Sequence, residues 1–176
     1  MGLDMYVTIR HKDTQSKLEA YEAWENKYSY EEYELLTDEQ REEHCNSEPE
    51  YDEDMYGKQL IYWRKANQIH NWFVKNCQNG VDDCGRYIVT LNQLKELKEL
   101  CEKIMTMTDG ENLTIEGGKF AEENLPSRSG FFFGSTDYDE YYVYDVKYTA
   151  NELVEVIRKV EEEYNEDYII EYTSSW

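Results

Sequence analysis

The amino-acid sequence predicts an α+β fold, with a mostly antiparallel sheet covered by helices in one domain over residues 1–176. Stretches with a period of two, typical of half-buried strands, stand near both ends of the chain, and stretches with helical periodicity lie between them. Strands and helices do not follow a strict strand–helix–strand repeat, which favours antiparallel pairing. At 176 residues the chain is long enough to bury a single substantial core.

The first predicted element is a strand from Leu3 to Arg10. Its apolar residues alternate along the chain: Leu3, Met5, Val7 and Ile9. Apolar residues at helical spacing then predict a helix over about 18–28. Residues 29–57 lack an apolar period and are expected to form an acidic insertion, apart from one short helix opened by Thr37 and Gln40.

The stretch Lys58–Cys77, KQLIYWRKANQIHNWFVKNC, is interpreted as one continuous core helix around which the chain is organised. Five residues fall on one helical stripe: Tyr62, Ala66, Ile69, Phe73 and Cys77. Arg64, Asn67 and Asn71 share a polar border of the same helix. Asn79-Gly80 predicts that the helix has ended by that point.

The following segment predicts a short strand from Arg86 to Val89 and then a helix. Thr90 and Gln93 form a capping box, and an apolar stripe continues to Met105. A further short strand is predicted at Leu113 to Ile115, between two glycine-containing turns.

The last third of the sequence is expected to contain a buried strand, a helix and a final strand. Phe131 to Phe133 predict the buried strand, which ends in the polar loop 135–137. Thr149 and Glu152 predict the start of an amphipathic helix. Alternation from Asp167 to Thr173 predicts the closing strand.

The charge of the chain restricts the partners that it can bind. There are 39 acidic residues against 18 basic ones, for a net charge of −21. Such a field repels nucleic acid and anionic membrane and attracts basic proteins. The acidic segment supplies the predicted partner-binding residues: Glu31, Glu32, Asp38, Glu39, Glu42, Glu43, Asp52, Glu53 and Asp54. Glu161 to Glu163 form a second acidic region, and a surface that only keeps the protein soluble is the alternative.

A cytoplasmic location is predicted from the cysteines and the apolar stretches. The four cysteines show no C-x-x-C spacing, which favours reduced thiols. No stretch is long and apolar enough to span a bilayer. The start MGLDMYVTIR runs directly into the first predicted strand.

A small-ligand site is predicted where the central helix meets the loop after the triple phenylalanine. A guanidinium, amides and hydroxyls on one edge suit an anion or a base edge, and a ring stacks on a base. The candidate residues are Trp63, Arg64, Asn67, His70, Asn71, Ser135, Thr136 and Asp137. The alternatives are a core histidine at His70 and an internal salt bridge at Arg64.

Catalytic and metal chemistry find less support in the sequence. His70 with Asp137 or Asp139 would serve as an acid–base pair in an enzyme. No phosphate-binding glycine loop, dinucleotide fingerprint or zinc spacing is present. We therefore predict no catalytic residues, no metal and no cofactor.

Three motifs resemble a family of small proteins encoded by bacteriophages and prophages. They are MGLDMY at the start, YWRKANQIHNWFV at Tyr62–Val74 and SGFFFGSTDYDEYY at Ser129–Tyr142. The resemblance extends over most of Lys58–Trp176 and is weak or absent across Ser29–Asp54. It implies a phage origin but carries no established activity.

These observations lead to two function hypotheses from different classes. The first is a non-enzymatic phage accessory protein that binds and inhibits a host protein with a basic surface, such as an antiviral defence system, in the host cytoplasm. The acidic residues would then imitate nucleic acid, as an anti-CRISPR-like inhibitor does. The second is a small-ligand binder that sequesters a signalling nucleotide between the 58–77 helix and the 130–137 segment.

Overall fold

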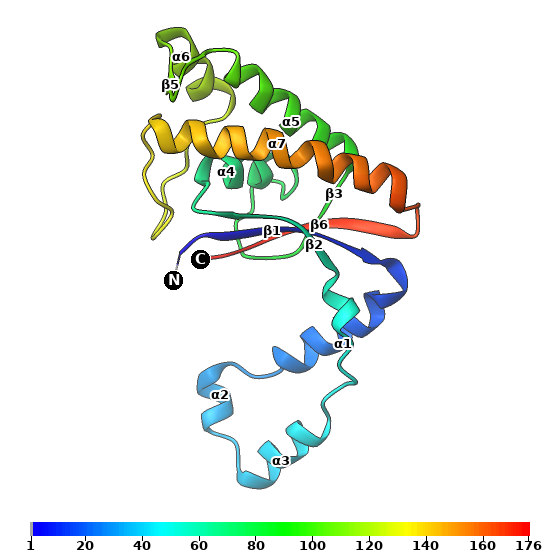
Figure 1. Ribbon diagram of the computed structural model, residues 1–176. Coiled ribbons are helices and arrows are strands. Elements are labelled where there is room, and N and C mark those ends of the chain that lie inside the picture. The colour runs from blue at the N-terminus through cyan, green and yellow to red at the C-terminus, as the bar shows by residue number, and fades with distance from the viewer. Residues whose placement is uncertain (1) are drawn as a thin grey trace. The chain divides into compact units, whose positions relative to one another are not determined.

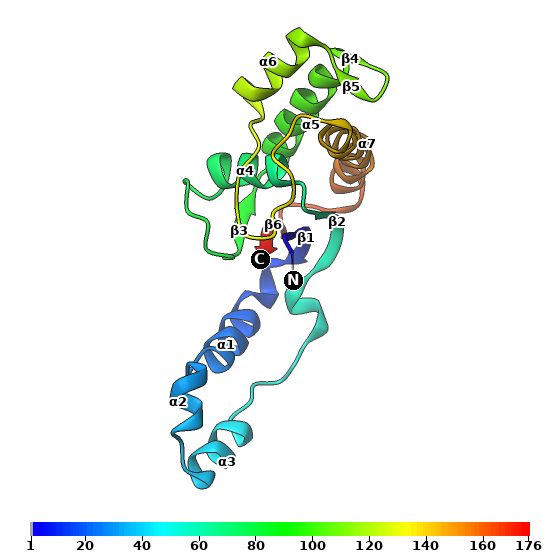
Figure 2. The same ribbon diagram turned by 90° about the vertical axis from the view of Figure 1, so that its left-hand side faces the viewer.

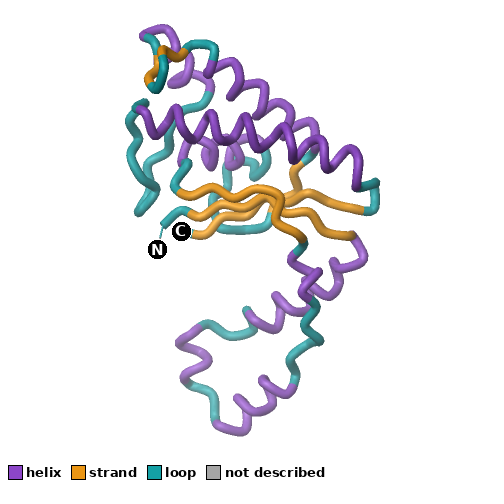
Figure 3. Tube along the Cα trace, in the orientation of Figure 1, coloured by secondary structure: helices purple, strands orange, loops and turns teal. Residues whose placement is uncertain are grey.

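The computed structural model describes residues 2–176 and has an α+β fold (Figure 1). Within these residues, a four-stranded antiparallel sheet has the strand order β2-β1-β6-β3, and a two-stranded hairpin pairs β4 with β5. Figure 3 shows the helices α4, α5 and α7 on one face of the larger sheet. The predicted fold class is confirmed.

The strands come from widely separated parts of the chain. In chain order they are β1 (Asp4–His11), β2 (Lys58–Arg64), β3 (Tyr87–Val89), β4 (Thr108–Asp109), β5 (Asn112–Leu113) and β6 (Tyr168–Ser175). β3 pairs with β6 so that Tyr87 lies opposite Tyr172. The α-helices are α1 (Gln15–Glu25), α2 (Tyr30–Glu34), α3 (Asp38–Asn46), α4 (Asn67–Asn76), α5 (Leu91–Met105), α6 (Ile115–Asn124) and α7 (Glu140–Glu163). Two 3₁₀ turns, η1 (Lys12–Thr14) and η2 (Glu53–Tyr56), lie in the first third of the chain.

The chain divides into two compact units. We call Arg10–Lys58 the acidic unit, and the described residues up to Ile9 together with Gln59–Trp176 the sheet unit. β1 and β2 are neighbours in the sheet, so the acidic unit is the connection between two adjacent strands.

The core of the sheet unit lies between the sheet and its helices. The predicted alternation of β1 is confirmed, because Met5, Val7 and Ile9 are buried and their neighbours Tyr6 and Thr8 are partly exposed. α5 and α7 lie side by side in both ribbon views (Figures 1 and 2). The predicted capping box of α5 is also confirmed: Gln93 N–H donates to the Thr90 hydroxyl, and Thr90 N–H donates to the Gln93 amide oxygen.

The interpretation of Lys58–Cys77 as one helix is wrong in its first half. Residues 58–64 form β2, in which Ile61 and Trp63 are buried, and the helix α4 begins only at Asn67. Lys65 separates the two elements with a left-handed φ of 62°. The run Leu-Ile-Tyr-Trp suits a strand as well as a helix, and periodicity over so few residues does not distinguish them. Arg64 therefore shares no helix border with Asn67 and Asn71.

The predicted buried strand at Phe131–Phe133 is also wrong, because residues 125–139 contain no helix or strand. Phe131 is 81% exposed and Phe132 is 53% exposed, whereas Phe133 is 3% exposed. Phe132 has a left-handed φ of 63°, which ends any extended run. A Cβ on Gly130 would lie 2.5 Å from the buried Phe133 ring, so glycine permits this close approach.

The helix predicted to start at Thr149 starts earlier. Asp139 caps α7 by accepting hydrogen bonds from the N–H groups of Tyr141 and Tyr142. Thr149 lies in the middle of α7, where its hydroxyl accepts the indole N–H of Trp63 at 2.8 Å. The predicted strand at Leu113–Ile115 is limited to β5, since Thr114 caps α6.

The acidic unit contains more helix than the sequence predicted. The capping box at Thr37 is confirmed and opens α3, and Ser29 with Glu32 forms a second box that opens α2. Within this unit the imidazole of His44 stacks on Trp24 with ring centroids 4.9 Å apart, and Tyr28 and Tyr33 meet His44 edge-on. A small aromatic cluster therefore holds together a segment that is otherwise poor in buried apolar residues.

Candidate functional site

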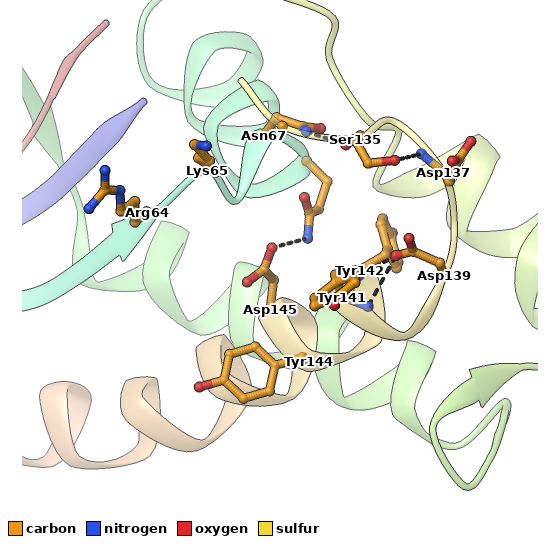
Figure 4. A pocket seen from close by; sticks show the side chains of 12 residues that line it. Arg64, Lys65, Asn67, Ser135, Asp137, Asp139, Tyr141, Tyr142, Tyr144 and Asp145 are labelled. Carbon is orange, nitrogen blue, oxygen red and sulfur yellow. Dashed lines mark hydrogen bonds between the residues drawn. The ribbon is translucent and has the colours of Figure 1, made fainter. Parts of the chain in front are cut away.

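A cavity of about 340 Å³ in the sheet unit brings the two motif segments together (Figure 4). The end of β2, the start of α4, the loop before α7 and the first turns of α7 all contribute to its wall. The lining residues are Arg64, Lys65, Asn67, Gln68, Gly134, Ser135, Asp137, Asp139, Tyr141, Tyr142, Tyr144 and Asp145. Four of the predicted ligand-binding residues are among them: Arg64, Asn67, Ser135 and Asp137.

The backbone around Lys65 brings the two segments close together. The Lys65 N–H donates to the Leu3 carbonyl at 2.7 Å while the residue holds its left-handed conformation. A Cβ on Gly134, whose φ is 95°, would lie 3.4 Å from the Cβ of Lys65. Left-handed non-glycine residues are costly and are enriched at functional sites, and one of the four among the described residues, Lys65, lines this cavity.

Asn67 fixes the loop that closes the cavity. Its Nδ2 donates to the carbonyl of Phe133 at 3.2 Å and to that of Ser135 at 2.7 Å. Its Oδ1 accepts the N–H of Arg128 at 3.0 Å. Because the buried amide is used by the protein's own backbone, Asn67 shapes the cavity and has little capacity left for a ligand.

The charged groups lie at opposite sides of the cavity. Figure 4 shows Arg64 and Lys65 on one side and Asp137 and Asp139 on the other. The Arg64 side chain is 63% exposed and lies 4.0 Å from Asp4, which leaves most of its donors open. Asp139 Oδ1 already accepts two N–H groups of α7. The cavity is therefore bipolar, with its cationic end at Arg64 and Lys65.

Asp145 is the half-buried carboxylate of this cavity. Its Oδ2 accepts one hydrogen bond, from Nε2 of Gln68 at 3.3 Å. Burial raises the pKa of Asp145 to about 6, and the Gln68 hydrogen bond lowers it only in part. The carboxyl is therefore mostly ionised at pH 7, and it keeps acceptor capacity for a further donor.

Two tyrosine rings stand at the mouth of the cavity. Tyr141 is 69% exposed and Tyr144 is 65% exposed, although both belong to the first turns of a core helix. Tyr142 points inward instead, and its hydroxyl donates to the Leu125 carbonyl. The exposed rings offer flat apolar faces to a ligand beside Asp145.

The other predicted ligand-binding residues lie elsewhere. His70 is completely buried, with Nδ1 2.7 Å from the Tyr172 hydroxyl and Nε2 3.1 Å from Oδ2 of Asp82. Asn71 Nδ2 donates to the Pro126 carbonyl. Trp63 contributes to a neighbouring hollow, and Thr136 is not among the described residues that line the cavity.

The neighbourhood of His70 does not form the acid–base pair that an enzyme hypothesis requires. Its carboxylate partner is Asp82, not Asp137 or Asp139. Burial lowers the pKa of His70, and Asp82 opposes that shift, so the net effect favours the neutral imidazole. Asp82 also forms an ion pair with Arg128 at 3.0 Å and accepts the indole N–H of Trp176 at 3.1 Å. This network joins four separate segments and serves the fold.

The cavity also contains residues that the sequence analysis missed: Lys65, Gln68, Tyr141, Tyr144 and Asp145. A signal was present in the stretch YYVYD at 141–145. Read as a helix, it places Asp145 one turn after Tyr141, with Tyr144 next to it on the same face. The sequence analysis instead predicted a strand at Phe131–Phe133 and started the helix at Thr149, so residues 141–145 were not placed on a helix.

Most of the predicted partner-binding carboxylates point into solvent. Eight of the nine are exposed, and Asp52 is half-buried in an ion pair with Lys17 at 2.7 Å. In the part of the chain that the structure describes, no lysine or arginine forms an ion pair with the other eight. The second acidic region differs, because Glu161 pairs with Lys95 and Glu162 with Arg158.

Among residues 2–176, no group of three or more His, Cys, Asp or Glu side chains is arranged to hold a metal ion. Over the same residues, no helix combines the length and the apolar character that crossing a bilayer requires.

Comparisons with known proteins add no relative to this description. The chain matches no protein-family model, no curated protein and no solved structure. The resemblance to phage proteins therefore stays a prediction from the three motifs.

Proposed function

We propose that this protein is a non-enzymatic binding protein that sequesters a small nucleotide in the cavity between β2, α4 and α7. The observation that carries the proposal is the convergence of two motifs on one bipolar hollow, where Asn67 of one motif bonds Ser135 of the other, 68 positions along the chain. Its volume of about 340 Å³ lies at the small end of the range of about 300–1,000 Å³ that ligand pockets occupy.

Each part of a nucleotide finds a chemical counterpart in the wall. A phosphate suits the cationic end, where Arg64 supplies a planar set of donors and Lys65 a second positive charge. A base suits the exposed faces of Tyr141 and Tyr144. With a net charge of −21 and three aspartates in the wall, the protein favours a ligand with a single phosphate over a polyphosphate.

Isothermal titration calorimetry with nucleoside monophosphates and cyclic mononucleotides tests this proposal. We expect saturable binding, and a loss of at least about tenfold in affinity in Arg64→Ala, since hydrogen bonds to a charged group contribute about 1.5–3 kcal/mol. Arg158→Ala is the matched control, because Arg158 lies outside the cavity and pairs with Glu155 and Glu162. Absence of binding by every nucleotide, or equal losses in both variants, would refute the proposal.

A second candidate function rests on the eight exposed carboxylates without a cationic partner. In this proposal the protein is a phage accessory protein that binds and inhibits a basic, nucleic-acid-binding host component in the host cytoplasm. Solvated carboxylates that lack an internal cationic partner leave their field available to an approaching basic surface. Complementary charge of this kind raises the association rate and selects the partner.

Salt dependence and a charge variant test this second function. Capture of a basic host protein should weaken steeply between low salt and about 0.5 M, because screening shortens the range of exposed charges. The double variant Glu42→Gln/Glu43→Gln should weaken capture at low salt. Glu122→Gln/Glu123→Gln, on the exposed face of α6, is the matched control. Capture that is unchanged at about 0.5 M salt would argue against an electrostatic partner site. So would equal capture by the wild type and by the Glu42→Gln/Glu43→Gln variant.

A further inference from the structure

The carboxylate of Asp145 has a position that distinguishes it from the other acids of the cavity. Asp137 is exposed in a loop, and Asp139 accepts N–H groups from the N-terminus of α7. Asp145 is half-buried and has one hydrogen-bond donor, Gln68, on one of its two oxygens. A donor from a ligand therefore meets an acceptor that is shielded from competing water.

We infer that the cavity selects guanine, with the carboxylate of Asp145 accepting the N1–H and N2–H groups of the base. This inference rests on the proposed nucleotide-binding function and names the base that the site prefers. The geometry matches, because guanine alone among the common bases presents two adjacent N–H donors on its Watson–Crick edge, and a carboxylate presents two adjacent acceptors.

The other common bases fit the same carboxylate less well. Adenine and cytosine each place one N–H donor beside a ring nitrogen that is itself an acceptor, and uracil flanks its N–H with two carbonyls. Each of these would set a lone pair against a carboxylate oxygen. That repulsion costs more beside a half-buried carboxylate than in open solvent, because less water is present to screen it.

The rest of the wall supports one orientation of the ligand. With the Watson–Crick edge at Asp145, the base lies next to Tyr141 and Tyr144, which Figure 4 places beside that carboxylate. The phosphate then extends toward Arg64 and Lys65. One phosphate balances this end without bringing further negative charge near Asp137 and Asp139.

An exchange of base preference tests the inference directly. The wild-type protein should bind guanosine monophosphate at least about tenfold more tightly than the inosine, adenosine or xanthosine monophosphates, since a good pair of hydrogen bonds to a base discriminates by about 1–3 kcal/mol. Asp145→Asn replaces one acceptor with a donor. Xanthine replaces the guanine N2–H donor with a carbonyl, so this variant should prefer xanthosine monophosphate.

A matched variant and a pH profile serve as controls. Asp109→Asn makes the same chemical change at an exposed residue of β4 outside the cavity and should leave the preference for guanine unchanged. Binding of guanosine monophosphate by the wild type should weaken as the pH falls through about 6, because a protonated Asp145 no longer accepts two donors. Asp145→Asn reports the titration of the phosphate alone and should lack this extra loss.

The outcomes separate the two proposals. Equal affinity for guanosine and adenosine monophosphates, or an unchanged preference in Asp145→Asn, would overturn the selection of guanine and leave the nucleotide site standing. Failure of the wild type to bind any of the four nucleotides would overturn the selection of guanine, and failure to bind the other nucleoside monophosphates and cyclic mononucleotides as well would overturn both. A cooperative unfolding transition verifies that the Asp145→Asn variant is folded before its base preference is compared with that of the wild type.

Discussion

Replacing Phe73 with alanine should lower the free energy of unfolding by about 3–5 kcal/mol, the usual cost of removing a buried aromatic side chain. Phe73 is completely buried at the centre of the sheet unit. Its ring stacks on Tyr172 with centroids 4.0 Å apart and meets Trp63 and Trp72 edge-on. The substitution leaves a cavity between α4 and β6 that these large rings cannot collapse to fill.

Phe131→Ala is the matched control for Phe73→Ala. Phe131 undergoes the same chemical change on a side chain that is 81% exposed, so its free energy of unfolding should stay within about 0.5 kcal/mol of wild type. Urea unfolding followed by far-ultraviolet circular dichroism measures both. Similar losses in the two variants would contradict the assignment of Phe73 to the core and of Phe131 to the surface.

Asp82→Ala should cost about 2–3 kcal/mol, although the residue lies in a loop, because a buried polar group left without its partner costs about 1–3 kcal/mol. The change removes the carboxylate oxygen that the buried imidazole of His70 shares with the partly exposed guanidinium of Arg128. The carboxylate contacts three side chains from different segments: His70 of α4, Arg128 of the loop before α7, and Trp176 after β6. His70 is completely buried, so water cannot replace the lost acceptor.

The adjacent Asp83 provides the control for Asp82. Asp83 is exposed and accepts only local hydrogen bonds, from the Gly85 N–H and the Tyr87 hydroxyl. Asp83→Ala should therefore cost less than about 1 kcal/mol. If denaturant titrations give the two alanine variants the same midpoint, the network around Asp82 does not stabilise the sheet unit.

The parts of the fold that the sequence predicted are those in which a single local rule decides the structure. The alternation of β1 and the capping boxes of α3 and α5 are of this kind. The errors arose where two rules competed. Residues 58–64 satisfied both a helical stripe and a strand run. Thr149 with Glu152 matched a capping box inside a helix that begins at Glu140, after its cap Asp139.

The candidate site was predictable in part for the same reason. The sequence predicted that Arg64 and Asn67 would meet Ser135, and they line one cavity. It placed Asn71 in the site because a continuous helix would present Asn71 on the same border as Arg64 and Asn67. It also placed His70 there, and a buried core histidine was the alternative. The left-handed turn at Lys65 shifts that register, and non-glycine residues give no sequence signal for such a conformation.

The connection between β1 and β2 has a consequence for engineering. Because these neighbours in the sheet run antiparallel, a two-residue Asn-Gly turn would join them as an ordinary hairpin after residues 10–58 are excised. Shortening a loop in this way lowers the entropy lost on closing it. The same 49 residues, counted from Arg10 to Lys58, would likewise form a transplantable cassette for hairpin loops in unrelated scaffolds.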